Sequence, residues 1–170
     1  NPDECPPFYR DASTEVGLAL TRDFISEVRA LPGNGGLVQP VVTPRFIPSC
    51  TDRMLLGLGR IAADTKAIVQ THCSESDWQH GYVLKRYGKS DTEALTGFGL
   101  MRESTVLAHG NFLSGADMGV IKRRGAGIAH CPLSNYYFSN AVFPLRRALD
   151  AGVHVGLGTD ISGGPSPSTL

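Results

Sequence analysis

Five short apolar runs recur along the chain, and within each run the apolar residues are nearly continuous instead of alternating with polar ones. The runs are rich in Val, Ile, Leu and Ala, which is typical of strands that are buried on both faces of a parallel sheet. The predicted strands lie at 37–46, 67–73, 104–110, 126–132 and 153–160. The pattern therefore predicts a parallel sheet that is covered on both faces.

Helical segments with recognisable ends separate these strands. A serine or threonine that can cap a helix precedes four of them, and glycine or proline marks most of their carboxyl ends. The predicted helices run from Ser13 to about Ala30, over DRMLLGLGRIAADT after Thr51, over DWQHGYVLKRY between Ser76 and Gly88, from Ser114 to Gly125, and from Pro144 to Gly152. Strands that alternate with helices in this way predict an α/β fold.

Two α/β architectures satisfy right-handed crossovers, an open doubly wound sheet and a closed (β/α)8 TIM barrel. No G-x-G-x-x-G follows a strand, and the glycine-rich GLGTDISGG at 156–164 lacks both that spacing and the Gly-Lys-Ser/Thr of a phosphate-binding loop. The barrel is therefore favoured. The last predicted strand ends ten residues before residue 170, so we expect residues 1–170 to be the C-terminal portion of one barrel domain, without its first strands and closing helix.

Composition and charge narrow the function classes. The chain has 16 basic and 16 acidic residues without a concentration of either sign, so nothing favours nucleic acid or an anionic membrane as a partner. No apolar run approaches the roughly 20 residues that a membrane helix needs. The first residues, NPDECPPFYRD, lack the pattern of a signal peptide. The four cysteines show no C-x-x-C spacing, so we expect no zinc knuckle, no disulfide framework and a reducing, cytoplasmic setting.

Each predicted strand has a polar residue at or near its carboxyl end. These residues are Arg45, His72, His109, His130 and Asp160. In a barrel the carboxyl ends of the strands converge on one mouth, which is where such folds carry their chemistry. Three of the five histidines of the chain stand at these ends, which is hard to attribute to chance.

Each of these residues also has a structural interpretation, because a single histidine at a strand end more often makes a hydrogen bond than binds a metal. Two local features favour chemistry. Glu75 lies an odd number of positions after His72, so it falls on a loop, from which it can fold back over a ligand held by His72. Asp160 shares its strand parity with Gly156 and Gly158, whose small size leaves room for a metal or a substrate.

The other histidines are interpreted in the same way. His109 follows an apolar approach and forms a polar tip, as His72 does, whereas His130 precedes a Cys-Pro bend and is expected to make a structural hydrogen bond. His80 and His154 are expected on a helix surface and in mid-strand, without a role. An imidazole with a carboxylate suits Zn²⁺ or Fe²⁺, but two protein ligands are too few, so further ligands must come from elsewhere.

Four motifs in this order resemble the amidohydrolase superfamily, in its aminohydrolase and chlorohydrolase branch: THCSE, VLAHG, AHCPLSN and GLGTD. TPRF at 43–46, SC at 49–50 and the full GLGTDISGG make the chain most similar to the guanine deaminase family of that branch. The resemblance runs from about residue 37 to the C-terminus, and residues 1–36 are similar only in their helical pattern. Guanine deaminases with the cytidine-deaminase fold are excluded, because their H-x-E and P-C-x-x-C signature is missing.

This resemblance implies a metal-dependent hydrolase barrel to which the chain supplies strands four to eight. His72 and Asp160, at the ends of strands five and eight, would hold a Zn²⁺ ion, with Fe²⁺ as the alternative. Glu75 would carry protons, and His109 would hydrogen-bond the attacking water or the forming intermediate. Asp160 would also act as the general base towards that water.

The implied reaction is the zinc-dependent hydrolytic deamination of guanine to xanthine and ammonia, by attack of a metal-activated hydroxide on the ring carbon that bears the amino group. Arg45 and Phe46, at the end of strand four, would contact this purine together with His72 and Glu75. The full-length protein would be a cytoplasmic homodimer that acts on a small molecule.

One departure from the family is large, because its His-x-His pair, which completes the metal site, occurs nowhere in the chain. We therefore expect an inner fragment of a longer enzyme that is inactive alone. Two alternatives stay open. One is another aminohydrolase or a chlorohydrolase of the same branch, and the other is a barrel domain that has lost its chemistry and serves only for binding.

Overall fold

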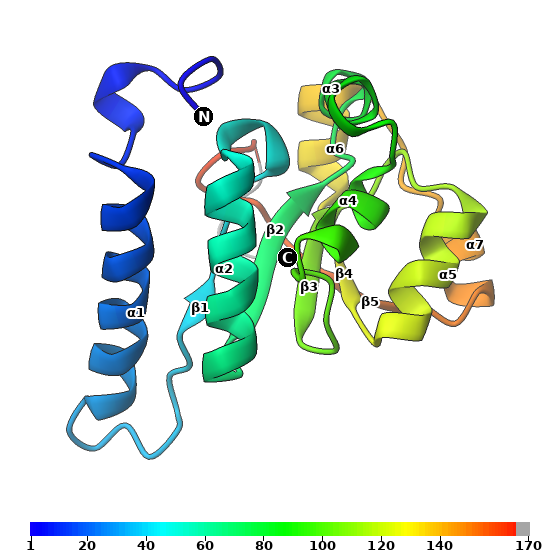
Figure 1. The fold of residues 1–170 in the computed structure, drawn as a ribbon. Helices are drawn as coiled ribbons and strands as arrows, with labels where there is room; N and C mark the ends of the chain where they lie inside the picture. Colours follow the sequence, from blue (N-terminus) through cyan, green and yellow to red (C-terminus); the bar gives the residue numbers. More distant parts are fainter. Residues whose placement is uncertain (166–170) are drawn as a thin grey trace.

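The computed structural model describes residues 1–165, in which five parallel strands form one sheet with helices packed against it (Figure 1). The strands are β1 (Val41–Val42), β2 (Ile68–Cys73), β3 (Thr105–His109), β4 (Gly127–His130) and β5 (His154–Leu157). All five predicted strands are present and parallel, which confirms the α/β prediction. They lie side by side in chain order, as in part of a barrel, whereas the order of a doubly wound sheet reverses.

β1 is much shorter than the strand predicted at 37–46. Proline cannot donate a backbone hydrogen bond to a neighbouring strand, and Pro40 and Pro44 stand on either side of Val41–Val42. Beyond Pro44 the chain still runs beside β2, because the backbone N–H of His72 donates to the carbonyl of Arg45 over 3.0 Å.

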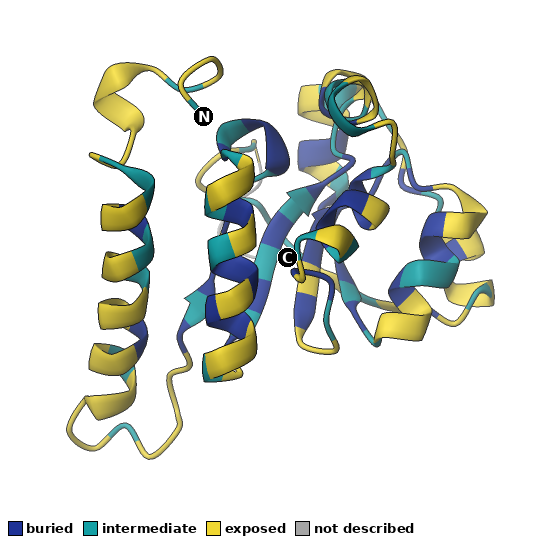
Figure 2. Ribbon diagram, in the orientation of Figure 1, coloured by how far each residue is buried: buried dark blue, intermediate teal, exposed yellow. Residues whose placement is uncertain are grey.

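Only one face of the sheet is fully covered, contrary to the prediction that both are (Figure 2). Along β2, Val69, Thr71 and Cys73 are 0 % exposed, whereas the residues between them are partly exposed. The helices cover the first set. The second set lies on the face that a closed barrel would turn inward, and these five strands do not close a barrel.

Seven α-helices and two short 3₁₀ helices surround the sheet within residues 1–165. The α-helices are α1 (Thr14–Ala30), α2 (Asp52–Thr65), α3 (Asp77–Tyr87), α4 (Asp91–Gly97), α5 (Gly115–Arg124), α6 (Pro132–Ser139) and α7 (Leu145–Asp150), and the 3₁₀ helices are η1 (Pro7–Tyr9) and η2 (Ile47–Ser49). All four predicted caps accept a hydrogen bond from a backbone amide in the first turn of their helix: Ser13, Thr51, Ser76 and Ser114. These local signals therefore place the helix starts correctly.

Two helices escape the sequence prediction. α4 begins after Ser90, whose side chain forms a complete capping box with Glu93. α6 begins at Pro132, where we expect only a bend after β4, because proline is also well suited to the first turn of a helix. In α7, Pro144 is the residue before the helix and not part of its first turn.

α2 contains a glycine because another segment comes very close to it. A Cβ atom on Gly59 would lie 1.9 Å from the carbonyl oxygen of Phe98, which directly follows α4. The same helix contributes Leu55 and Ile61 to the core, and both are at most 1 % exposed. A larger residue at position 59 would therefore push a core helix away from its neighbour.

The register of the sheet brings small residues together beside His72. His72 pairs with Ala108, Ala108 with Ala129, and Ala129 with Gly156. Paired residues of parallel strands share a face, so this row lies on the open face of the sheet. The row leaves space next to His72, and Gly156 lies on the face that its parity predicts.

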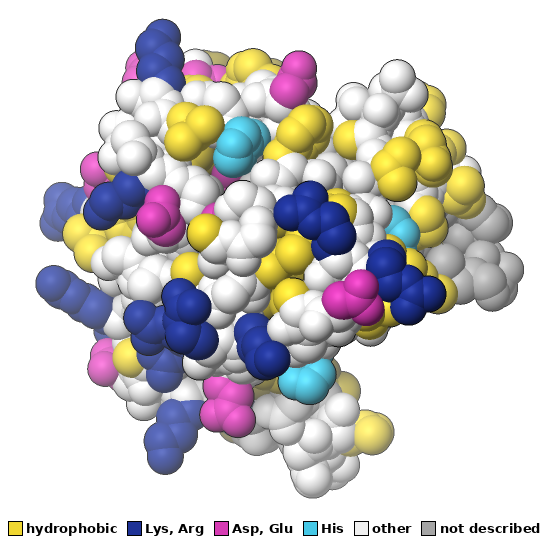
Figure 3. Space-filling view, turned by 90° about the vertical axis from the view of Figure 1, so that its right-hand side faces the viewer, with side chains coloured by type: hydrophobic (Ala, Val, Ile, Leu, Met, Phe, Trp, Pro, Cys, Tyr) yellow, Lys and Arg dark blue, Asp and Glu magenta, His cyan; other side chains and the backbone are white. Residues whose placement is uncertain are grey.

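The surface beside α5 and α7 carries basic, acidic and hydrophobic side chains in a mixture (Figure 3). This mixture agrees with the 16 basic and 16 acidic residues of the chain. Among the described residues, no helix combines the length and the apolar character that crossing a membrane requires.

Candidate active site

The predicted site residues lie at the carboxyl edge of the sheet, by which we mean the carboxyl ends of the strands and the loops that follow them. His109 and His130 are the last residues of β3 and β4, and His72 is the last but one of β2. Arg45 and Asp160 are predicted at strand ends, but in the structure they lie three residues beyond β1 and β5. Proline interrupts the first strand, and the pairing of β5 with β4 stops where β4 ends.

Three side chains at the carboxyl edge converge on one point, namely those of Glu75, His109 and Asp160. Each offers one ligand atom, and these atoms all lie within 4.8 Å of one another. Glu75 lies on the loop between β2 and α3, as predicted, and its Oε1 is 3.6 Å from His109 Nε2. His109 is fully buried, whereas Glu75 and Asp160 are partly exposed. A buried imidazole thus meets two carboxylates that a substrate can reach.

The backbone at this edge is left-handed at three residues that are not glycine. The φ angle is 48° at Ser74, 74° at His109 and 51° at Asp160, a region that such residues rarely adopt outside functional sites and helix ends. At His109 the register partner is Cys73, so regular alternation would place this ring on the face opposite His72. Instead the rings of His72 and His109 stack, with centroids 5.2 Å apart. The left-handed backbone brings the two imidazoles together.

Asn135 fixes the orientation of the His109 ring. Its Oδ1 lies 2.9 Å from His109 Nδ1, and its Nδ2 lies 3.4 Å from His130 Nδ1. Burial, reinforced by the positive charge that His109 can carry, lowers the pKa of His130, so His130 is neutral and accepts this bond. The amide oxygen of Asn135 therefore accepts from His109 Nδ1, and the ring presents Nε2 towards Glu75. Among residues 1–165 this buried Nε2 has no hydrogen-bond partner.

Two consecutive residues in the first turn of α6 support the site. Besides Asn135, the buried Ser134 hydrogen-bonds with Asp160 through its hydroxyl group. Neither residue is predicted from the sequence, although both stand in the AHCPLSN motif. The available signal is Pro132, which starts a helix directly after a strand end and so turns the next residues towards the site. His130 makes the structural hydrogen bond that the sequence predicts.

His72 lies beside the convergent group and not within it. Its Nδ1 is 2.6 Å from the carbonyl oxygen of Arg45, so Nδ1 carries the proton and donates. A histidine that donates one ring N–H to a carbonyl presents its other nitrogen in a fixed orientation, which is the usual arrangement of metal-ligating histidines. The role of His72 as a metal ligand stays a prediction, with the required tautomer in place.

An aromatic cluster stands next to His72. The Phe46 ring meets the His72 ring at a centroid distance of 6.4 Å and the Trp78 ring at 6.2 Å. The guanidinium of Arg45 lies 5.4 Å from the centre of the Phe46 ring and 5.6 Å from that of Tyr9. Sequence reasoning misses Tyr9 and Trp78, because no pattern connects their positions with the strand ends. The cluster offers aromatic rings and a guanidinium, partly exposed, to a planar ligand.

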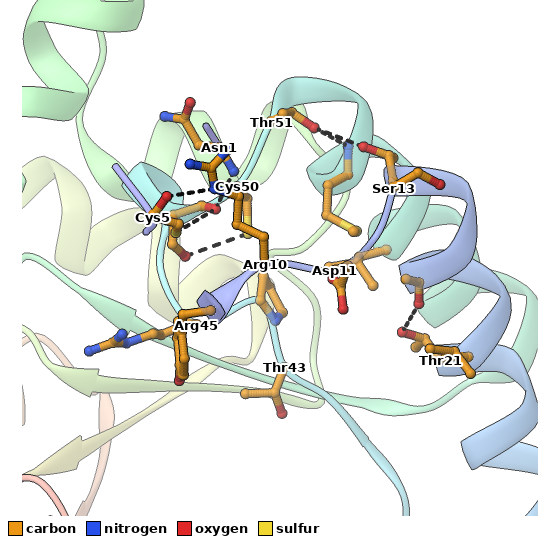
Figure 4. A pocket seen from close by; sticks show the side chains of 18 of the residues that line it. Asn1, Cys5, Arg10, Asp11, Ser13, Thr21, Thr43, Arg45, Cys50 and Thr51 are labelled. Atoms are coloured by element: carbon orange, nitrogen blue, oxygen red, sulfur yellow. Dashed lines mark hydrogen bonds between the residues drawn. The ribbon is translucent and has the colours of Figure 1, made fainter. Parts of the chain in front are cut away.

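A cavity of about 690 Å³ lies between α1, α2 and the β1 side of the sheet (Figure 4). Thr43 and Arg45 line it from the segment around β1, Thr21 from α1 and Met54 from α2. Within the described part of the chain, the three convergent side chains do not line this cavity. The cavity is therefore separate from the convergent side chains, and it reaches the carboxyl edge through the segment after β1 that contains Thr43 and Arg45.

The thiols near the carboxyl edge are unreactive. Burial, followed by the negative charges of Asp160 and Glu75, raises the pKa of Cys131 to about 11. Burial also raises the pKa of Cys73 well above its ordinary value. Both thiols stay protonated near neutrality, which makes them poor nucleophiles and poor metal ligands. The four cysteines of the chain are all free.

The donor set at the carboxyl edge fits a divalent metal ion. Imidazole nitrogen and carboxylate oxygen are both ligands of Zn²⁺ and Fe²⁺. The buried Nε2 of His109 has no partner among the described residues, and the ligand atoms of two carboxylates lie within 4.8 Å of it. Two carboxylates this close to each other favour a bound cation.

Known proteins resemble the chain over nearly all of its length. Residues 3–170 match the model of the amidohydrolase family. A guanine deaminase of Dictyostelium discoideum is 37% identical over 170 residues, which are 99% of this chain and 37% of that protein. A guanine deaminase of Rattus norvegicus is 39% identical over 166 residues, which are 96% of this chain and 36% of that protein.

A solved structure agrees with these sequence matches. The crystal structure of guanine deaminase from C. acetobutylicum, with guanine bound in its active site, has a TM-score of 0.88 and 31% identity, over 95% of this chain and 38% of that one. The match confirms the partial-barrel prediction. The chain thus spans little more than a third of the length of each of these relatives. The family match begins at residue 3, so it includes the N-terminal segment that the motifs do not reach.

Proposed function

Because the chain belongs to the amidohydrolase family, we propose that it forms part of the active site of a metal-dependent enzyme that deaminates guanine hydrolytically to xanthine and ammonia. The observation that carries this proposal is the convergence of Glu75, His109 and Asp160 at the carboxyl edge, where barrels carry their chemistry. Identity of 37% to a guanine deaminase over 99% of the chain supports the choice of substrate.

We assign the chain to strands four to eight of a longer barrel. It spans 37% of the guanine deaminase of D. discoideum, and its five-stranded sheet has two unpaired edges at which further strands can add. The His-x-His pair of the family occurs nowhere in the sequence, so the remaining metal ligands would come from the rest of the enzyme. Residues 1–170 alone are then inactive.

His72, in β2, and Asp160, in the loop after β5, would hold the metal ion, Zn²⁺ or Fe²⁺. His72 presents Nε2 because its Nδ1 donates to a backbone carbonyl, and Asp160 is oriented by the hydroxyl of Ser134. When bound, the ion supplies Lewis-acid activation of water at neutral pH.

Glu75 moves protons in this proposal. Its carboxylate lies on a loop, partly exposed and 3.6 Å from His109 Nε2, so it can reach both an attacking water and a purine at the edge. It would carry one proton of the attacking water to the ring nitrogen N3, and the second water proton, which Asp160 would remove as general base, to the leaving amine. His109 would hydrogen-bond the same water, or the forming intermediate, through Nε2 and so orient it.

Arg45 and Phe46 would select guanine. Guanine has two acceptors, O6 and N7, that a guanidinium fork reaches together, whereas adenine presents an amino donor in place of O6. Arg45 is exposed and forms no ion pair among the described residues, so its donors are free for a ligand. Sites built on hydrogen bonds reject analogues that lack the partner by large factors.

Ammonia release by the full-length enzyme tests this proposal, with guanine and adenine as substrates. We expect turnover of guanine and not of adenine. Arg45→Ala should mainly raise KM for guanine and narrow the difference between the two purines, and Arg45→Lys should not restore it, because an ammonium group lacks the planar fork.

Arg29→Ala is the matched control for Arg45→Ala. The guanidinium of Arg29 donates to the carbonyl of Thr65, at the ends of α1 and α2, so its loss should leave both purines unaffected. Turnover of adenine by the wild type, or unchanged guanine kinetics in Arg45→Ala, would contradict the proposed specificity.

A further inference from the structure

We propose that Asp91 is a positioning residue for Glu75, which it holds through a buried hydrogen-bond network. The inference deepens the proposed function and rests on it, because it concerns the loop that carries the proposed proton carrier. Asp91 is the first residue of α4, one of the two helices that the sequence does not reveal, and it is 1 % exposed.

The Asp91 carboxylate accepts hydrogen bonds from both sides of Glu75. On the amino side, the backbone N–H and the hydroxyl of Ser74 donate to it over 3.3 Å and 3.0 Å. On the carboxyl side, Gln79 Nε2 donates over 3.1 Å and His80 Nδ1 over 3.4 Å. One buried carboxylate therefore ties together the two ends of the loop between β2 and α3.

Gln79 passes this restraint on to Glu75 itself. Its Oε1 accepts the backbone N–H of Glu75 over 3.3 Å, and its Nε2 also donates to the carbonyl of His72 over 3.2 Å. The carbonyl of Glu75 accepts from Asn111 Nδ2 over 2.8 Å. Buried side chains thus bind both the backbone N–H and the carbonyl of Glu75. Gln79, which binds the N–H, is itself hydrogen-bonded to Asp91.

The network also holds an unfavourable backbone. Ser74 has a φ of 48°, which a residue other than glycine adopts only when its surroundings impose it. Its hydroxyl and its backbone N–H both donate to Asp91, and its carbonyl accepts from the backbone N–H of Phe112, so the carboxylate holds one side of this strained residue. The turn at Ser74 is what redirects the chain from β2 and places the next residue, Glu75, beside His109.

Asp91 is not needed to cap its own helix. Ser90 caps α4 and forms a complete capping box with Glu93. Burying a carboxylate is costly unless hydrogen bonds compensate it, and among the described residues no lysine or arginine forms an ion pair with Asp91. The carboxylate therefore serves the loop of Glu75 and not the helix in which it stands.

A second buried carboxylate provides a matched control. Asp117 is 5 % exposed and accepts hydrogen bonds from Thr92 Oγ1 over 2.5 Å and from the backbone N–H of Ser114 over 2.8 Å. It closes the capping box of α5, and within residues 1–165 its carboxylate forms no hydrogen bond with the loop that carries Glu75. Asp117→Asn thus removes a buried carboxylate of the same kind without touching the proposed positioning.

The test compares Asp91→Asn with Asp117→Asn in the full-length enzyme. We expect Asp91→Asn to lower kcat for guanine by about 10–100-fold, since an ångström-scale misplacement of a catalytic group has effects of that size, and to leave KM nearly unchanged. Asp117→Asn should lower the thermal midpoint and leave kcat unchanged. In a Glu75→Gln background, Asp91→Asn should cause no further loss, because the group that it positions is already gone.

A merely structural role for Asp91 predicts different results. The two effects on kcat would then be additive in the double variant, or kcat would not change in Asp91→Asn, and either result overturns the proposal. If Asp91→Asn does not fold, Ser74→Ala is the alternative variant. It removes the hydrogen bond from the Ser74 hydroxyl to Asp91, and alanine is as strained as serine at this positive φ. It should lower kcat by a smaller factor and again not add to Glu75→Gln.

Hydrogen–deuterium exchange separates this inference from the proposed function, because it needs no turnover. Backbone amides of residues 72–79 should exchange faster in Asp91→Asn than in the wild type and in Asp117→Asn. Faster exchange in a protein that does not deaminate guanine would support the hold on the loop and refute the proposed function. Unchanged exchange in residues 72–79 would refute the hold by Asp91, whatever the activity.

Discussion

The carboxyl edge of the sheet and the helix layer, by which we mean α1 to α7, both contain residues with left-handed backbone, but they use them differently. In the helix layer such residues end helices, as Lys66, Gly88, Gly125 and Asn140 do for α2, α3, α5 and α6. At the carboxyl edge the same conformation occurs away from helix ends, at Ser74, His109 and Asp160.

The two regions also differ in how completely their polar groups are hydrogen-bonded. The capping boxes of α4 and α5 are complete, whereas His109 Nε2 at the carboxyl edge has no partner among the described residues. A left-handed helix end satisfies backbone groups and so stabilises the fold. The left-handed residues at the edge satisfy no helix, and each raises the free energy of the folded chain. The helix layer therefore stabilises the fold and offsets the backbone strain at the carboxyl edge.

Removal of a predicted metal ligand should have the largest effect and should be confined to the edge. In the full-length enzyme, His72→Ala should lose the bound metal, and guanine turnover should fall to background, because the ion that activates water is gone. Metal content and ammonia release measure the two effects. His154→Ala is the control, since His154 is an exposed imidazole at the start of β5, and it should keep both metal and turnover.

Retention of the metal in His72→Ala would contradict the ligand assignment. It would also move the metal site to the convergent group of Glu75, His109 and Asp160 alone. The thermal midpoint should change little in His154→Ala, because this side chain is exposed and no metal is lost. In His72→Ala it should fall, because a metal that binds only the folded protein stabilises it.

A substitution in the helix layer should change the stability of the protein and leave its kcat unchanged. Gly59→Ala should destabilise the protein by about 1–3 kcal/mol, because overpacking forces the helix away from its neighbour. The added Cβ would lie 1.9 Å from the carbonyl oxygen of Phe98. Gly81→Ala is the matched control, a glycine inside α3 with no atom within 4 Å of its added Cβ, and it should stabilise by about 0.4–1 kcal/mol.

Chemical denaturation of the wild type and both glycine variants measures these differences. At temperatures where the proteins are folded, kcat should be the same in all three. A change in kcat without a change in stability would contradict the claim that the helix layer acts on stability and the carboxyl edge on catalysis.

The smallest expected effect is a pH dependence at the junction of the two regions. The hydrogen bond to Asp91 raises the pKa of His80 above its ordinary value of 6.5, against the opposing effect of burial. Because the folded state binds this proton more tightly, the stabilisation is complete below pH 6.5 and is lost as the pH rises through the raised pKa. Unfolding of the wild type and His80→Gln across this range should show a difference that shrinks with rising pH. A difference that grows would contradict the assignment.

The parts of the fold that could be predicted are those with local signals. Apolar runs gave the strands, and single residues such as Ser76 and Gly88 gave the ends of a helix. The row of strand-end histidines and the loop position of Glu75 also follow from short-range spacing. β1 is shorter than its apolar run because Pro40 and Pro44 limit the strand pairing, which is a local effect as well.

The supports of the site could not be predicted, because they join distant residues. Asn135 orients His109, and Ser134 orients Asp160, each from 26 positions away. Spacing also cannot show that the backbone at His109 departs from strand alternation, since this depends on the packing around a fully buried ring. The prediction thus identifies which residues stand at the edge, and the structure adds how they are turned.

The most direct test of the central claim measures bound metal and guanine turnover in the same preparation of the full-length Glu75→Gln variant. The claim is that Glu75 moves protons at an edge whose metal is held by other residues. It predicts a metal content equal to that of the wild type and a kcat lower by about 10²–10⁴-fold. Loss of the metal together with activity would make Glu75 a ligand, and unchanged kcat would make it a solvated loop residue, so either result would contradict the claim.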